Sequence, residues 1–108
     1  MPQSWQLIQQ RLSGAASAIQ PGMGKSYTLA DLDVLVCNVD GSYYAIEDVC
    51  THDGAPLDQG HLEGNCIVCP RHGATFDVKT GEALTLPAVV PVMTFPVTID
   101  GDDILVDI

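Results

Sequence analysis

The apolar and polar positions of this chain follow the short runs and alternations of β-strands rather than a helical period. The clearest example is a run rich in β-branched residues at positions 34–39, which ends in Asp40-Gly41. A second apolar run follows at residues 43–46. Two such runs separated by an Asp-Gly pair predict a β-hairpin.

The same order of run, turn and run recurs twice. It appears at residues 97–106 around Asp100-Gly101, and at residues 74–86 around a turn at residues 79–82. Three hairpins and no long helical period predict an all-β protein, built as a small antiparallel barrel or sandwich. The length of 108 residues fits one domain, so we assign residues 1–108 to a single domain.

Less regular segments surround these hairpins. Residues 5–8 are predicted as a first strand, and the small residues at positions 13–20 as a surface connection. Three prolines keep residues 86–96 from forming one continuous strand.

Composition narrows the possible partners. The formal net charge is −10, with 14 acidic residues against four Lys and Arg. Such a surface repels nucleic-acid phosphates and anionic lipid, so we expect neither partner. No apolar run approaches the ~18 residues of a membrane span, and residues 1–10 carry no basic signal region. We therefore expect a cytoplasmic monomer whose cysteines bind metal rather than form disulfides.

The candidate chemistry is concentrated in residues 49–77, which hold three of the four cysteines and all three histidines. Cys50 and His52 form one Cys-x-His group. After sixteen intervening residues, Cys69 and His72 form a Cys-Pro-Arg-His group. Two loops that each present one thiolate and one imidazole can bind two metal ions.

The sequence around these groups resembles that of Rieske [2Fe–2S] proteins. CTHDGAPL at residues 50–57 and CPRHGATFD at residues 69–77 are similar to the two cluster-binding loops of that family. LPAVVP at residues 86–91 resembles the proline-bearing segment that covers the cluster. The resemblance extends from about residue 26 to residue 108. It implies a Rieske-like fold with a cluster-binding subdomain at about residues 48–77.

The resemblance implies that Cys50, His52, Cys69 and His72 bind one [2Fe–2S] cluster per chain. Within the family, the two cysteines bind one iron and the two histidines bind the other. Both irons are then fully coordinated, so no position is open for a substrate and no catalytic residue is expected.

The remaining cysteines and histidine have simpler interpretations. Cys37 and Cys66 read as strand cysteines, and His61 as a solvent-exposed residue of a polar loop. The alternative is a structural zinc site, because Cys66 and Cys69 form a Cys-x-x-Cys pair that Cys50 and one histidine could complete.

A mononuclear iron site of two histidines and a carboxylate cannot be assembled, since only His61 remains. The chain also has no Gly-rich dinucleotide fingerprint. It looks like a Rieske-type ferredoxin. This resemblance implies transient partners: an FAD-containing, NAD(P)H-dependent ferredoxin reductase and a terminal aromatic-ring-hydroxylating dioxygenase. A small subunit permanently bound in another oxidoreductase is the alternative.

Four positions bear on the reduction potential. High-potential members of the family carry a disulfide-forming cysteine in each loop, where this chain has Ala55 and Arg71. They also carry a Ser and a Tyr that hydrogen-bond near the sulfurs, where this chain has Ala74 and Phe76. The missing hydroxyls and the acidic composition predict a potential at the low end of the family range.

Overall fold

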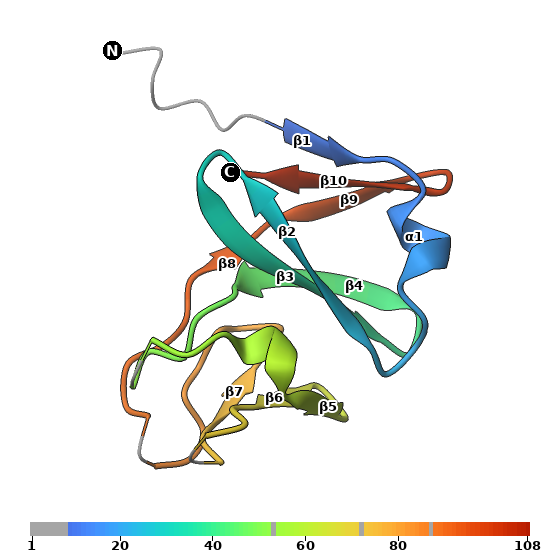
Figure 1. The fold of residues 1–108 in the computed structure, drawn as a ribbon. Helices are drawn as coiled ribbons and strands as arrows, with labels where there is room; N and C mark the ends of the chain where they lie inside the picture. Colours follow the sequence, from blue (N-terminus) through green and yellow to red (C-terminus); the bar gives the residue numbers. More distant parts are fainter. Residues whose placement is uncertain (1–8, 53, 72, 87) are drawn as a thin grey trace.

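The computed structural model describes residues 9–52, 54–71, 73–86 and 88–108. Three antiparallel sheets dominate these residues (Figure 1), and the expected all-β fold is confirmed. The first strand predicted at residues 5–8 lies outside them.

Ten strands, one short α-helix and one 3-10 turn make up the described fold. In chain order they are β1 (Gln9–Leu12), α1 (Ala15–Ala18), β2 (Gly24–Leu29), β3 (Leu32–Val39), β4 (Ser42–Glu47), η2 (Leu57–Gln59), β5 (His61–Glu63), β6 (Cys66–Val68), β7 (Thr75–Asp77), β8 (Thr94–Phe95), β9 (Val97–Asp100) and β10 (Asp103–Asp107). The sheets have the strand orders β1-β10-β9, β2-β3-β4-β8 and β5-β6-β7. No helix of the described residues is long and apolar enough to cross a membrane.

The central sheet has a hydrophobic core on each face, and β3 contributes to both. Successive strand residues point to opposite faces. Val34 and Val36 therefore join one core, while Leu35 and Cys37 join the other. All four are almost fully buried. This continuous apolar run at residues 34–37 is what a strand covered on both sides requires.

The two outer sheets lie on opposite sides of this central sheet (Figure 1). The β1-β10-β9 sheet covers one side, where Ile104 and Val106 of β10 pack with Val34 and Val36. The β5-β6-β7 sheet and the segments around it cover the other side. Cys50 belongs to the core on that side, so the central sheet supports the region where the ligands were predicted.

Two of the three predicted hairpins are confirmed. Asp40 and Gly41, with φ of 53° and 92°, form the turn between β3 and β4. Positive φ at both turn residues matches the twist of the flanking strands. The β9–β10 hairpin also forms, with Ile104 opposite Ile99.

The third prediction, a full hairpin at residues 74–86, is wrong in its second half. β7 forms, but its partner is reduced to a single bridge between Phe76 and Ala83. Leu84 and Thr85 still lie beside β7, because the N–H of Leu84 donates to the Thr75 carbonyl at 2.8 Å and the N–H of Thr75 donates to the Thr85 hydroxyl at 2.9 Å. The side chains of Leu84 and Leu86 are nevertheless exposed. The segment predicted as a connection at residues 13–20 contains α1.

A hairpin between β5 and β6 was not predicted. Its two-residue turn is Gly64-Asn65, with Gly64 at φ 62° and Glu63 opposite Cys66. The Gly-Asn pair was the available signal. His61 therefore lies on a strand rather than in a loop, although it is exposed as expected.

Candidate metal centre

The two segments predicted to bind the cluster have the same backbone hydrogen bonds. In loop 1 (residues 50–55), the N–H of Cys50 donates to the carbonyl of Ala55 at 2.7 Å. In loop 2 (residues 69–74), the N–H of Cys69 donates to the carbonyl of Ala74, also at 2.7 Å. Each loop is thus a six-residue turn closed between its cysteine and its alanine.

A glycine makes each turn possible. Gly54 donates its N–H to the Cys50 carbonyl at 2.7 Å, and Gly73 donates to the Cys69 carbonyl at 3.0 Å. Their φ values are 77° and 74°, in the left-handed region that favours glycine. A Cβ at either position would meet nothing within 4 Å. The requirement for glycine is therefore backbone conformation and not lack of space.

Burial separates the two kinds of predicted ligand. The cysteines Cys50 and Cys69 are each 1% exposed and belong to the same hydrophobic core. His52, two residues after Cys50, is exposed. His72, the fourth predicted ligand, lies outside the described residues.

This donor set fits a [2Fe–2S] cluster with two cysteines and two histidines. In such a cluster each iron binds only two side chains, and the thiolates and imidazoles bind different irons. Buried Cys50 and Cys69 beside an exposed His52 match that division. Among the described residues, no three His, Cys, Asp or Glu side chains are placed to hold a single metal ion.

The other two cysteines lie where the neutral thiol is favoured over the thiolate that a metal binds. Burial, and then the charges of Asp77 and Glu63, raise the pKa of the Cys66 thiol. Burial, and then the charge of Asp48, raise the pKa of Cys37 to about 12. Geometry also gives no support to a zinc site at Cys66. Among the described residues, Cys50, Cys66 and Cys69 do not form a group that could hold a single metal ion.

The segment predicted to cover the cluster does contact loop 1. The Thr51 hydroxyl donates to the Val90 carbonyl at 2.6 Å, while Ala88 and Val92 anchor the segment in the core at 4% exposure each. Pro87 lies outside the described residues. The other apolar side chains here form an exposed group, which we call the apolar rim: Leu84 (43% exposed), Leu86 (77%), Val89 (73%), Val90 (54%) and Met93 (56%).

The apolar rim was missed in the sequence, although the run LTLPAVVPVM was its signal. Elsewhere in the described residues, only Met23 and Ile99 are large hydrophobics of comparable exposure. Contiguous exposed apolar side chains mark contact sites for other molecules. The segment that touches loop 1 is thus also the main apolar surface of the described chain.

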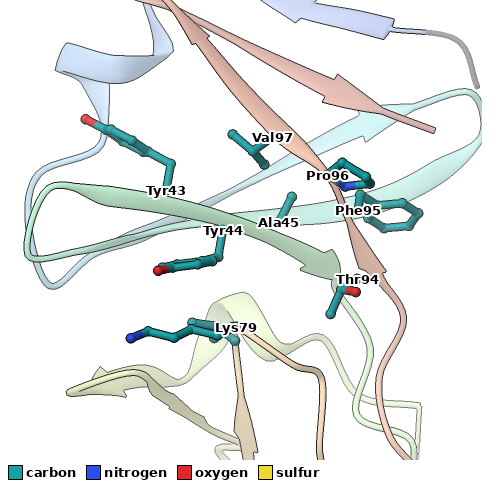
Figure 2. Close-up of a pocket in the computed structure, with 9 residues that line it drawn as sticks. Tyr43, Tyr44, Ala45, Lys79, Thr94, Phe95, Pro96 and Val97 are labelled. Atoms are coloured by element: carbon teal, nitrogen blue, oxygen red, sulfur yellow. The ribbon is translucent and has the colours of Figure 1, made fainter.

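One hollow of the described structure lies away from both loops. It is a cavity of about 420 Å³ lined by β4, β8, the start of β9 and the residues after β7, and Lys79 and Tyr44 face one another across it (Figure 2). The Lys79 ammonium is 5.8 Å from the centre of the Tyr44 ring. The lining residues include no cysteine or histidine, so this hollow is not the metal centre.

Comparisons with known proteins agree with this chemistry. A family model described as "Rieske [2Fe-2S] domain" matches residues 10–96. The ferredoxin component of biphenyl 2,3-dioxygenase from Rhodococcus jostii (strain RHA1) is 48% identical over 75 residues, which cover 69% of this chain and 70% of that protein.

Solved structures give the same picture. The ferredoxin of carbazole 1,9a-dioxygenase from Nocardioides aromaticivorans IC177 is 36% identical, with a TM-score of 0.82 over 84% of this chain and 89% of that one. A second match, at 36% identity and a TM-score of 0.80, comes from a complex of reduced oxygenase and oxidized ferredoxin in carbazole 1,9a-dioxygenase. It covers 85% of this chain and 86% of that one.

Proposed function

Because the chain belongs to the Rieske [2Fe–2S] domain family, we propose that it is a one-electron carrier of an aromatic-ring dioxygenase system. Its cofactor is a Rieske-type [2Fe–2S] cluster. The observation that carries the proposal is the pair of matching loops, each with a cysteine buried at its start. The relatives are ferredoxin components, so the protein is an electron carrier and not itself the enzyme.

The proposed ligands are Cys50, His52, Cys69 and His72. The buried position of Cys50 and Cys69 keeps water from their sulfurs, and the exposed position of His52 leaves its ring accessible to a partner. When bound, the cluster takes up and releases one electron. The side chains at Ala74 and Phe76 offer no hydroxyl to the sulfurs, which favours a low potential.

A terminal oxygenase is one partner, as in the complex of the carbazole system. We propose that the oxygenase contacts the apolar rim, because the rim adjoins loop 1 through the Thr51–Val90 hydrogen bond. An FAD-containing, NAD(P)H-dependent reductase is the proposed electron donor. A carrier that meets two partners in turn needs small contacts with fast release. We further propose a monomer in the cytoplasm, where Cys37 and Cys66 remain unpaired thiols.

The test is purification of the full chain from cells that supply iron and sulfide. A red-brown protein with two irons per chain is expected, and dithionite should produce the EPR signal of a reduced Rieske cluster with one electron per chain. A colourless zinc protein would contradict the proposal.

The carrier role needs a second measurement. A ferredoxin reductase and a terminal oxygenase of an aromatic-ring dioxygenase system should turn over aromatic substrate only when the chain is added, and should work with catalytic amounts of it. Co-purification with another oxidoreductase in fixed stoichiometry would favour the permanent-subunit alternative instead.

A further inference from the structure

Asp48 is the only charged side chain of the described residues that is buried, at 8% exposure. It directly follows β4 and lies two residues before Cys50. A buried carboxyl group costs free energy unless its oxygens are hydrogen-bonded. Its partners therefore indicate why it is there.

The contacts of Asp48 join three separate parts of the chain. Its Oδ1 accepts the backbone N–H of Asp58, in η2, at 2.8 Å. Its carboxyl group is also hydrogen-bonded to the side chain of Ser26 on β2. Its own N–H donates to the Asp33 carbonyl on β3 at 2.8 Å. The central sheet thus holds Asp48, and Asp48 holds the start of η2.

The two loops differ in how their ends are held. Loop 2 runs directly from β6 to β7, and Val68 is paired with Thr75 across its ends. Loop 1 leaves β4 and continues into η2, and no β-ladder of the described residues joins these two elements. The Asp48–Asp58 hydrogen bond supplies the missing connection, because it spans the whole of loop 1.

We infer that Asp48 is a positioning residue for the redox site, whose carboxylate clamps loop 1 shut so that Cys50 and His52 are held in place. This inference rests on the ligands assigned in the proposed function. The clamp needs an acceptor oxygen within hydrogen-bonding distance of the Asp58 N–H, which the length of the Asp48 side chain provides. It does not need a negative charge. Asp48→Asn should therefore preserve the clamp. Asp48→Glu should not, because its side chain is one methylene longer.

The experiment compares Asp48→Asn, Asp48→Glu and Asp48→Ala as full-length proteins with cluster. The readouts are the rate of iron release to a chelator and the EPR linewidth of the reduced protein. Loss of a partner that orients a metal ligand costs about 10- to 100-fold in affinity. We expect Asp48→Ala and Asp48→Glu to release iron about tenfold faster than wild type and to have broadened EPR lines. The iron release of Asp48→Asn should stay within about twofold of wild type.

Asp33→Ala is the matched control. Asp33 and Asp48 line one hollow of about 260 Å³ beside loop 1, and the Asp33 carboxylate accepts the Thr28 hydroxyl at 3.0 Å. It should behave like wild type, which separates the clamp from loss of local charge.

Two results would overturn the inference: wild-type iron release in Asp48→Ala, or equally fast release in Asp48→Asn and Asp48→Ala. If Asp48→Ala does not fold, the comparison of Asp48→Asn with Asp48→Glu decides the question, because only Asp48→Glu should release iron faster than wild type. A wild-type protein without the Rieske EPR signal would instead overturn the proposed function. The two failures are therefore distinguishable.

Discussion

The hydroxyl of Thr51 donates to the carbonyl of Val90 at 2.6 Å, across 39 residues of sequence. Thr51 lies between the proposed ligands Cys50 and His52, and Val90 belongs to the apolar rim. One hydrogen bond therefore connects the site that holds the electron to the surface that we expect partners to contact.

Replacing Thr51 by Val keeps the shape of the side chain and removes this bond. A neutral hydrogen bond contributes about 1 kcal/mol, so the segment around Val90 should open about fivefold more often. The amide of Val92, which donates to the Gly81 carbonyl at 2.8 Å, is the reporter in a hydrogen-exchange measurement. Thr51→Ser keeps the hydroxyl and should exchange at the wild-type rate. Equal exchange in both variants would mean that the bond does not hold the segment.

Replacement of any of the four proposed ligands should abolish the cluster. We expect Cys50→Ser, His52→Ala, Cys69→Ser and His72→Ala to contain well under two irons per chain when iron is assayed against protein. Folding should weaken with cluster loss, since the buried cysteines of both loops are part of one core. Full iron content in His72→Ala would disprove the assignment.

The controls for this series are the residues that the structure places elsewhere. Cys37 is fully buried in β3, Cys66 lies on β6, and His61 pairs with Glu63 at 2.7 Å on β5. Cys37→Ala, Cys66→Ser and His61→Ala should all retain two irons per chain. Loss of iron in Cys66→Ser would show that Cys66 helps to bind the cluster and would contradict the assignment.

Local turn chemistry explains which parts of the fold could be predicted. The Asp-Gly pairs were sufficient for the β3–β4 and β9–β10 hairpins, because the turn itself fixes the pairing of its strands. The strand expected at residues 83–86 is reduced to one bridge and the hydrogen bonds of Leu84 and Thr85 to Thr75, because no local signal shows where a chain departs from its neighbour. That departure depends on the burial of Ala88 and Val92 in the core, which is a tertiary effect.

The candidate site divides in the same way. Spacing and the family resemblance together predicted Cys50 and Cys69 as ligands, and the structure places both in one core. The assignment of all four ligands stays a prediction, and His72 lies outside the described residues. Asp48 carried no signal, because an acidic residue before a loop is ordinary in a chain with 14 of them. Its burial and its bond to Asp58 appear only in three dimensions.

The reduction potential should lie near the low end of the Rieske range of about −150 to +300 mV. Ala74 and Phe76 are both fully buried, and neither can donate a hydrogen bond from its side chain. Ala74→Ser and Phe76→Tyr should each raise the potential in voltammetry if the new hydroxyl reaches a sulfur, because such bonds stabilise the added electron. Ala45→Ser, in the core on the other face of the central sheet, should leave the potential unchanged.

Contact with the oxygenase should combine an apolar interface with electrostatic steering. Because the chain carries a net charge of −10, its association with a basic surface of the oxygenase should slow by about tenfold or more from dilute buffer to high ionic strength. The apolar rim acts differently, because short-range apolar contacts mainly set the dissociation rate. Leu86→Gln combined with Val89→Thr should therefore speed dissociation and leave the salt dependence of association intact. Both side chains are more than 70% exposed, at 77% and 73%, so stability should not change.

Ile99→Thr, which alters an exposed apolar residue on β9, is the control and should bind like wild type. Stopped-flow binding at several salt concentrations separates the two effects. If the variant with both rim substitutions bound like wild type while Ile99→Thr bound more weakly, the docking surface would lie on the β1-β10-β9 sheet and not beside loop 1.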